Sequence, residues 1–440
     1  MQIDEKILKG SAMRNECKTV VLWGVMIMLA GAGSAAPEAA MKRFTSPPKI
    51  DGDLNEICWE KEAAAIAIPG SEPTDVLLGY DDDQLYVAFK CRHHKPENIK
   101  STEFKRDGNI FMDDSVEVFL DTTHDHASYY QLAVNAAGTK FDGVRRKDSE
   151  AFSTSWDGEW EAKTKKVSDG FRVEMAIPFR ILRLGTNTVW GANFCRNSSR
   201  PSFNLSWAKV DLFHQPEKFG HLAGLSAPKY QTVTIERMPV CRCKIGENTY
   251  QVEVRNNGQE VRPVEGRIDY CGEYSAEFAY QAADKPAGAK RAEIGAQSVA
   301  ALDMPFNIGD KGLIRYRFSL KDVISSSSNV IYTEVFKQMI ESPIAVRLQS
   351  KVLFPREPVV IRYQANLSSD MLKDALLKID VCKDGQPLIT RTVAGKELKG
   401  SAIFIQSDLP AGAYIIRCEL FQQDRRVYTR EDAFEIMAGF

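Results

Sequence analysis

The run from Asp107 to Asp121 (DGNIFMDDSVEVFLD) places carboxylates and an aromatic loop directly before a predicted strand. Val116 and Val118 alternate with Ser115 and Glu117, which is the two-residue period of a half-buried strand. One face of this strand can therefore pack in a core. The opposite face presents a carboxylate that can accept hydrogen bonds from a polar ligand.

Two further runs, 129–135 (YYQLAVN) and 190–196 (WGANFCR), show the same alternation of apolar and polar positions. If the apolar positions face a core, the polar positions of the three strands can share one surface. The residues predicted on that surface are Glu117, Asn135, Asn193 and Cys195.

The carboxylates of this region do not predict catalysis. Glycoside hydrolysis needs a pair of carboxyl groups at a fixed separation, but Asp114 and Glu117 differ in strand parity and point to opposite faces. The chain also has no Gly-x-Ser-x-Gly elbow, no phosphate-binding loop and no HExxH zinc motif. We expect a protein that is not an enzyme.

Short runs of β-branched and aromatic residues, broken by Gly, Pro, Asp or Asn, fill the chain after Phe44 and predict an all-β protein. Turn signals at close spacing favour β-sandwiches over a parallel sheet. Three sandwiches are expected, at residues 44–225, 230–341 and 344–440, and the last two have an immunoglobulin-like pattern. Lys61–Ile68 is the best helical candidate.

The first 36 residues read as a signal peptide rather than as part of the fold. Val20–Ala32 is an apolar run that follows Arg14 and Lys18, and small residues suited to cleavage lie near Ala35 and Ala36. We expect a secreted or periplasmic protein with no transmembrane segment after cleavage. The net charge of −2 gives no electrostatic case for nucleic acid as a partner.

The acidic run at 107–121 belongs to an ordered series of motifs along the first half of the chain. The others are Ile50–Glu56 with Trp59, and the runs 76–89, 129–135, 170–179, 190–196 and 218–222. This series, from Phe44 to Leu225, resembles the family 9 carbohydrate-binding modules, a β-sandwich family related to DOMON-type domains. The resemblance implies a non-catalytic protein that binds oligo- or polysaccharide and is accessory to glycan degradation, with a glycoside hydrolase as a possible partner.

In the family, two aromatic side chains clamp a terminal sugar, and the matching positions here are Phe111 and Phe213. An aromatic ring can cover the C–H face of a pyranose while polar side chains meet its hydroxyl groups. Glu117 and Asn135 match hydrogen-bonding positions of the motif, and Asn193 is a further candidate. We expect Met112 and Trp207 to shape the walls of the site.

Two family positions depart from the pattern. Ala133 stands where the family has a binding Arg, and Cys195 stands where it has a binding Gln. Each lost hydrogen bond is worth about 1 kcal/mol net. The sugar bound by well-studied relatives therefore does not transfer to this chain.

The resemblance also implies a structural calcium ion. Candidate ligands are Asp51, Asp53 and Asp81, although their spacing matches no calcium-loop signature and also fits solvated turns. The run His124-Asp125-His126 is read as a solvated loop, because no third and fourth metal ligand can be identified.

Two alternatives from other classes remain open. One is a structural or assembly protein that keeps the sandwich without binding sugar. The other is an electron carrier with b-type haem bound near Met112, for which no second axial ligand or C-x-x-C-H motif is found. The eight cysteines after the signal region permit disulfides in an exported protein, but most lie in strand-like runs where buried thiols are expected.

Overall fold

A computed structural model describes residues 36–147, 151–210, 212–239, 241–273, 287–308, 312–323, 329–367, 369–406 and 408–438. The predicted signal peptide, apart from Ala36, lies outside these residues. The regular secondary structure of the described residues is dominated by β-strands, with only short helical turns beside them, which confirms the all-β prediction. In the described part of the chain, no helix is long and apolar enough to span a membrane.

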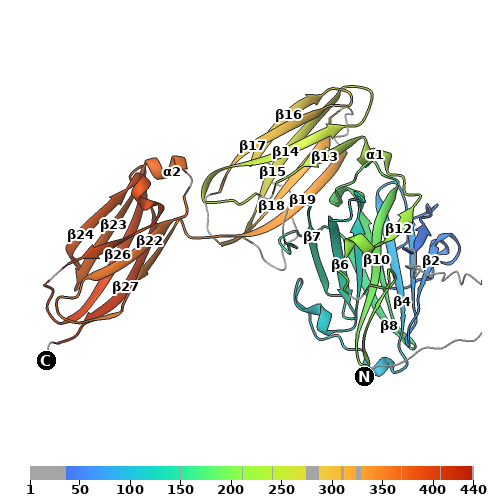
Figure 1. Cartoon of the computed structure of the whole chain (residues 1–440), viewed down its shortest axis with the longest axis horizontal. Helices are drawn as coiled ribbons and strands as arrows, with labels where there is room; N and C mark the ends of the chain where they lie inside the picture. Colours follow the sequence, from blue (N-terminus) through green and yellow to red (C-terminus); the bar gives the residue numbers. More distant parts are fainter. Residues whose placement is uncertain are drawn as a thin grey trace, which may run out of the picture. The chain divides into compact units, whose positions relative to one another are not determined.

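The first sandwich packs a seven-stranded sheet on a five-stranded sheet (Figure 1). The seven-stranded sheet has the order β1 (Glu38–Ala40), β12 (Gly220–Ala223), β10 (Val189–Ser199), β5 (Ser115–Asp121), β6 (Tyr129–Asn135) and β7 (Lys140–Arg145), with β11 (Ser202–Ser206) also paired to β10. The five-stranded sheet has the order β2 (Ala64–Ile68), β3 (Thr74–Tyr80), β4 (Gln84–Arg92), β9 (Gly170–Pro178) and β8 (Glu161–Val167).

The core of this sandwich is formed by the apolar faces that the alternation predicted. Val116, Val118 and Leu120 are fully buried in it beside Trp190 and Phe194. The core continues to Tyr230, which the sequence had placed at the start of the second unit. Tyr230 lies in the short helix α1 (Pro228–Gln231).

The helix predicted at Lys61–Ile68 is wrong. One turn of helix occupies Cys58–Glu62, and Ala64–Ile68 forms the edge strand β2. Burial alternates along β2, and the strand pairs with β3 over its whole length. This pairing outweighs the preference of an alanine-rich segment for helix, because helix propensity is a weak effect compared with tertiary contacts. Single short turns of 3₁₀-helix lie at Pro96–Asn98, Ile110–Met112, Phe179–Ile181, Pro216–Lys218 and Gly395–Lys399.

The second sandwich has its own core, from Val233 to Ile340. One sheet has the order β13 (Val233–Arg237), β14 (Gly246–Asn256) and β17 (Val299–Ile308). The other has the order β16 (Gly288–Ile294), β15 (Arg262–Glu273), β18 (Gly312–Asp322) and β19 (Asn329–Ile340).

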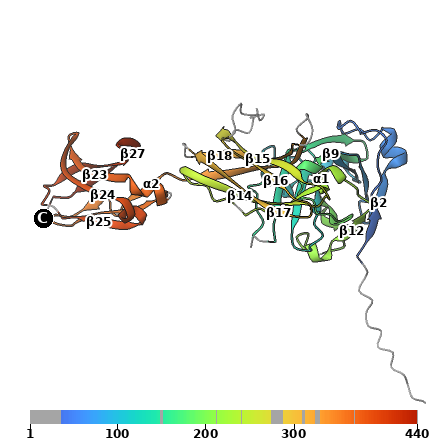
Figure 2. The ribbon, with the colours of Figure 1, turned by 90° about the horizontal axis from the view of Figure 1, so that it is seen from above.

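The third sandwich has a core from Ile344 to Ile436, and Figure 2 shows several of its strands in red. One sheet has the order β20 (Ile344–Leu348), β22 (Val359–Ala365) and β25 (Ser401–Ile405). The other has the order β21 (Val352–Leu353), β27 (Arg425–Ile436), β26 (Gly412–Gln422), β23 (Ala375–Lys383) and β24 (Gln386–Ala394), and the helix α2 spans Ser369–Lys373.

Backbone pairing joins the first sandwich to the second. Trp156 forms a β-bridge with Phe336 of β19, and the Asp157 N–H donates to the Val335 carbonyl at 3.0 Å. The segment around Trp156 therefore extends the edge of the sheet that contains β19. Edge pairing of this kind satisfies backbone groups that an exposed strand would leave open.

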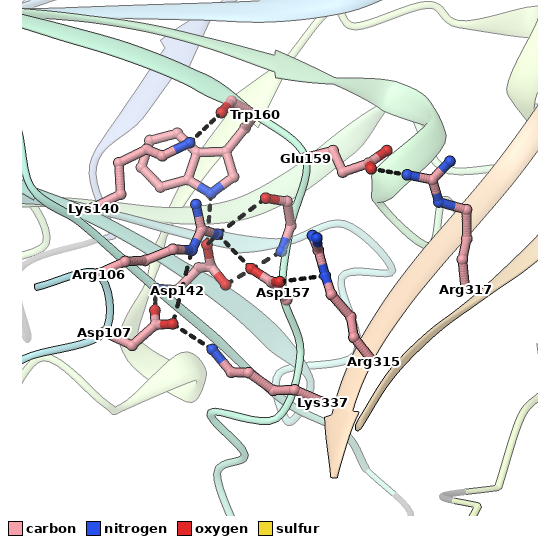
Figure 3. A network of polar contacts seen from close by, with 11 residues as sticks. Arg106, Asp107, Lys140, Asp142, Asp157, Glu159, Trp160, Arg315, Arg317 and Lys337 are labelled. Atoms are coloured by element: carbon pink, nitrogen blue, oxygen red, sulfur yellow. Dashed lines mark hydrogen bonds and ion pairs between the residues drawn. The ribbon is translucent and has the colours of Figure 1, made fainter. Parts of the chain in front are cut away.

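A polar network surrounds this junction (Figure 3). Asp157 accepts Arg106 of its own sandwich at 2.8 Å and Arg315 of β18 at 2.9 Å. Asp107 pairs with Lys337, and Glu159 pairs with Arg317. The loop that begins the acidic run is thus tied both to the first sheet and to the second sandwich.

Candidate functional site

The polar face is the surface of β5, β6 and β10 that points away from the core, and cross-strand pairing assembles it. Glu117 lies opposite Ala133 and Cys195, and the neighbouring row places Phe119 opposite Gln131 and Asn193. Asn135 and Asn197 flank Ser115 in the row beyond. The predicted polar residues therefore do share one surface, as strand parity requires.

Glu117 is buried at the centre of the polar face, with 3% of its surface exposed. Gln131 and Asn197 each donate an amide N–H to one of its carboxylate oxygens at 2.5 Å. Burial raises the pKa of Glu117 to about 7 even though these two hydrogen bonds act to lower it. The buried carboxyl group is thus hydrogen-bonded on both oxygens and keeps its proton to a higher pH than an exposed glutamate does.

Asn135 has an internal role in the structure. Its amide nitrogen donates to the Glu103 carbonyl and to Asp113, and its oxygen accepts from the N–H groups of Ala137 and Thr139. These bonds hold the loop before β5 against the turn after β6. A sugar hydroxyl would have to replace one of them.

Asn193 differs from Asn135 because half of its amide is unused. Its oxygen accepts Ser206 Oγ and the Ala208 N–H, both at 3.0 Å. Its buried Nδ2 has no hydrogen-bond partner among the described residues. An unpartnered buried donor is costly, so this atom is suited to a ligand oxygen.

Phe111 and Phe213 are both half-buried, and each packs on a different aromatic ring. The Phe111 ring lies 4.8 Å from Phe141, and the Phe213 ring lies 6.3 Å from Phe119. Phe152 packs against both clusters. The two predicted clamp rings therefore belong to an aromatic cover over the polar face instead of standing free around an open cavity.

Three large apolar side chains in the two loops that carry Phe111 and Phe213 do reach solvent. The exposed fraction is 61% for Met112, 75% for Phe104 and 67% for Leu212. Trp207 was predicted to form a wall of the site, but it is buried in the sandwich core against Phe194.

The proposed calcium ligands already have partners. Asp53 accepts Lys165 Nζ at 2.6 Å on both oxygens, and Asp51 pairs with Lys49 at 3.0 Å. Asp81 accepts the Tyr86 hydroxyl at 2.7 Å and backbone N–H groups of its own turn. Calcium at these residues stays a proposal, and it does not fit Asp51 and Asp53 well because each is paired with a lysine.

Residues 50–223 match the family described as carbohydrate family 9 binding domain-like. This part of the chain is a family 9-like domain. Its two sheets are those of the first sandwich, and the match covers the acidic run, the polar face and both aromatic loops. The resemblance read from the sequence is confirmed for this domain.

Curated relatives of the family 9-like domain are larger proteins. This chain is 26% identical over 219 residues to endo-1,4-beta-xylanase A of Thermotoga neapolitana, and to that of Thermotoga maritima, and the matches cover 46% of this chain and 18% of each relative. It is 29% identical over 150 residues to exoglucanase XynX of Acetivibrio thermocellus, covering 33% of this chain and 13% of the relative. The chain thus spans less than a fifth of the length of these relatives.

Similar solved structures include a family 9 carbohydrate-binding module from Caldicellulosiruptor kristjanssonii in complex with cellotriose. That match has 21% identity and a TM-score of 0.32, and covers 46% of this chain and 98% of the module. A carbohydrate-binding protein described as putative, from Bacteroides uniformis, matches with 14% identity and a TM-score of 0.32, covering 43% of this chain and 99% of that one.

Sequence reasoning assigned no site role to three residues that define the polar face of the family 9-like domain. Gln131 and Asn197 share the parity of Ala133 and Cys195, so alternation could have named them as partners of Glu117. Phe152 gave no such signal. It lies outside any strand and reaches the polar face only because its segment pairs with β7 through a bridge between Ser153 and Val144.

Proposed function

We propose that this chain is an exported, non-catalytic carbohydrate-binding protein and that its family 9-like domain takes an oligo- or polysaccharide at the polar face. The observation that carries the proposal is the unpartnered Asn193 amide, which lies on the same face as Glu117 within a domain of this family. The exposed Met112 and Leu212 in the flanking loops supply apolar surface of the kind that lines sugar sites.

The proposed role is accessory. The three sandwiches leave no room for a barrel-sized catalytic domain among the described residues. A binding module of this kind would serve a glycan-degrading enzyme by holding the enzyme on its substrate. A glycoside hydrolase is the proposed partner, and export by the N-terminal segment is the proposed route to it. N-terminal sequencing of the mature protein should find cleavage near Ala35 or Ala36.

A glycan array with plant and algal oligosaccharides, followed by calorimetry, tests the binding. We expect a dissociation constant between about 1 mM and 1 μM. Phe111→Ala, Phe213→Ala and Asn193→Ala should each weaken binding about five- to tenfold, since each removes about 1 kcal/mol. Arrays read with and without chelator test the calcium proposal at the same time.

Phe354→Ala is the matched control, because Phe354 is a 55% exposed phenylalanine in the third sandwich. Its replacement should leave the affinity unchanged. If the folded, fully stable protein binds none of the glycans, the result would instead favour a structural or assembly role. Two observations support that second candidate function: the internal hydrogen bonds of Asn135 and the near-complete burial of Glu117.

A further inference from the structure

Three histidines that are distant in the sequence meet at one end of the polar face. His124 and His126 lie in the loop between β5 and β6, and His221 lies on β12. His124 Nε2 is 3.0 Å from His221 Nδ1. The ring centroids are 4.6 Å apart for His124 and His126, 5.0 Å for His124 and His221, and 6.5 Å for His126 and His221.

We propose that His124, His126 and His221 form a binding site for a transition-metal dication such as Zn²⁺. Neutral imidazole is a preferred ligand of zinc, copper and nickel, whereas calcium prefers oxygen. Two nitrogens that each lie about 2.1 Å from a shared zinc ion are separated by about 3.0 to 3.5 Å at ordinary coordination angles. The His124–His221 pair already has that separation.

The loop is shaped to present its two histidines. His124 and His126 have positive φ angles of 51° and 57°, a backbone conformation that residues other than glycine rarely adopt. Asp121 holds the loop by accepting the N–H groups of Asp125 at 3.2 Å and of His126 at 2.8 Å. The left-handed residues are thus anchored by a buried carboxylate at the end of β5.

The sheet residue between Asp121 and His221 is a glycine. Gly191 of β10 lies between Asp121 and His221 in the cross-strand register. A Cβ atom at position 191 would lie 3.1 Å from Cβ of Asp121. Any larger residue there would therefore push on Asp121, which anchors the loop.

The cluster can close around an ion with little rearrangement. His124 and His221 are half-buried and close together, while His126 is exposed and can turn its ring toward them. Three imidazoles leave a fourth coordination position for water or for an oxygen of a bound molecule. This position lies at the edge of the polar face, one row beyond Phe119 and Asn193.

A second group, Glu72, His93 and His94, also brings possible ligand atoms together. Two of its members, His93 and Glu72, already have partners outside the group. His93 Nδ1 accepts the Lys95 N–H at 3.0 Å and its Nε2 lies 2.9 Å from the Arg200 carbonyl, while Glu72 faces the Arg196 guanidinium at 3.4 Å. A positive charge beside the carboxylate disfavours a dication there, so this group serves as the comparison site.

The test is isothermal calorimetry with ZnCl₂ on the metal-free, tag-free mature protein, supported by elemental analysis. We expect one Zn²⁺ per chain with micromolar or tighter affinity. His221→Ala and His124→Asn should each weaken binding by at least about tenfold. His126→Asn should weaken it less, because its ring must move to bind. Asn is chosen for 124 and 126 because it tolerates positive φ.

His94→Ala is the matched control, because it removes a histidine of the comparison site. It should leave zinc affinity unchanged, and circular dichroism should show that every variant is folded. Zinc should raise the melting temperature of the wild type but not of His221→Ala. Three outcomes would each overturn the proposal. They are equal zinc affinity in wild type and His221→Ala, loss of zinc binding in His94→Ala, and absence of zinc binding by the wild type. None of these readouts depends on sugar binding.

Discussion

Asp157 of the first sandwich and Arg315 of the second form an ion pair with 2.9 Å between carboxylate oxygen and guanidinium nitrogen. Their side chains are only 3% and 13% exposed, so water screens the pair weakly. The same carboxylate accepts Arg106, which in turn pairs with the buried Asp142. The orientation of the two sandwiches thus depends on charges that are shared across the junction.

Removing the charge at Asp157 should therefore uncouple the two sandwiches. Asp157→Asn leaves Arg315 facing a weaker acceptor, and breaking a largely buried pair should cost about 3 kcal/mol. We expect a lower melting temperature and separation of the calorimetric transition into two. Asp370→Asn, which breaks the exposed Lys373–Asp370 pair, is the control and should leave the melting temperature nearly unchanged, because water screens such a pair.

The raised pKa of Glu117 should make stability depend on pH. Between its ordinary pKa of 4.5 and about 7, the folded protein keeps a proton that the unfolded chain releases. The free energy of unfolding therefore falls by about 3 kcal/mol in total as pH rises from about 4.5 through 7. Asp142, whose pKa burial raises to about 6, acts in the same direction.

Urea unfolding at pH 5 and pH 8 measures this effect. Glu117→Gln cannot titrate, so its stability should fall less between the two pH values than that of the wild type. Comparison with the wild type separates Glu117 from Asp142, because Asp142 is present in both proteins. Parallel pH profiles of wild type and variant would contradict the prediction.

Phe152 should limit access to the polar face. Its ring occupies the space above Gly143 and stacks on Tyr129 at 6.0 Å. Phe152→Ala should lower the free energy of unfolding by about 2 kcal/mol, because the ring is half-buried. The same variant should bind more tightly any glycan that the wild type binds. Phe104→Ala, at a 75% exposed position, is the stability control. Unchanged or weaker binding by Phe152→Ala would show that the ring does not obstruct the site.

Cys241 and Cys243 should form a disulfide under oxidising conditions. Both are free thiols with sulfur atoms 3.2 Å apart, and the hydrogen bond from Cys241 lowers the pKa of Cys243. Exchange with oxidised glutathione would join the two sulfurs and release two molecules of reduced glutathione. Mass spectrometry after alkylation should find these two cysteines protected, with the buried Cys382 and Cys418 still reduced. A Cys241→Ser variant should show no such protection.

The sequence determined the face on which each strand residue lies. The two-residue period of residues 115–121 placed Val116 and Val118 in the core and Glu117 opposite them, because side chains alternate along any strand. The order of motifs was enough to identify the family 9-like domain. These features are local or depend on residue order, so they can be read without coordinates.

Only the tertiary structure decided what covers the polar face and which residues meet across it. Phe152 reaches the face through a pairing made by its neighbour Ser153, and His221 joins His124 because β12 and β5 flank the same strand, β10. Trp156 meets Phe336 across 180 residues of chain through edge pairing between two sandwiches. Contacts of this kind depend on the order of strands in a sheet, and strand periodicity carries no information about that order.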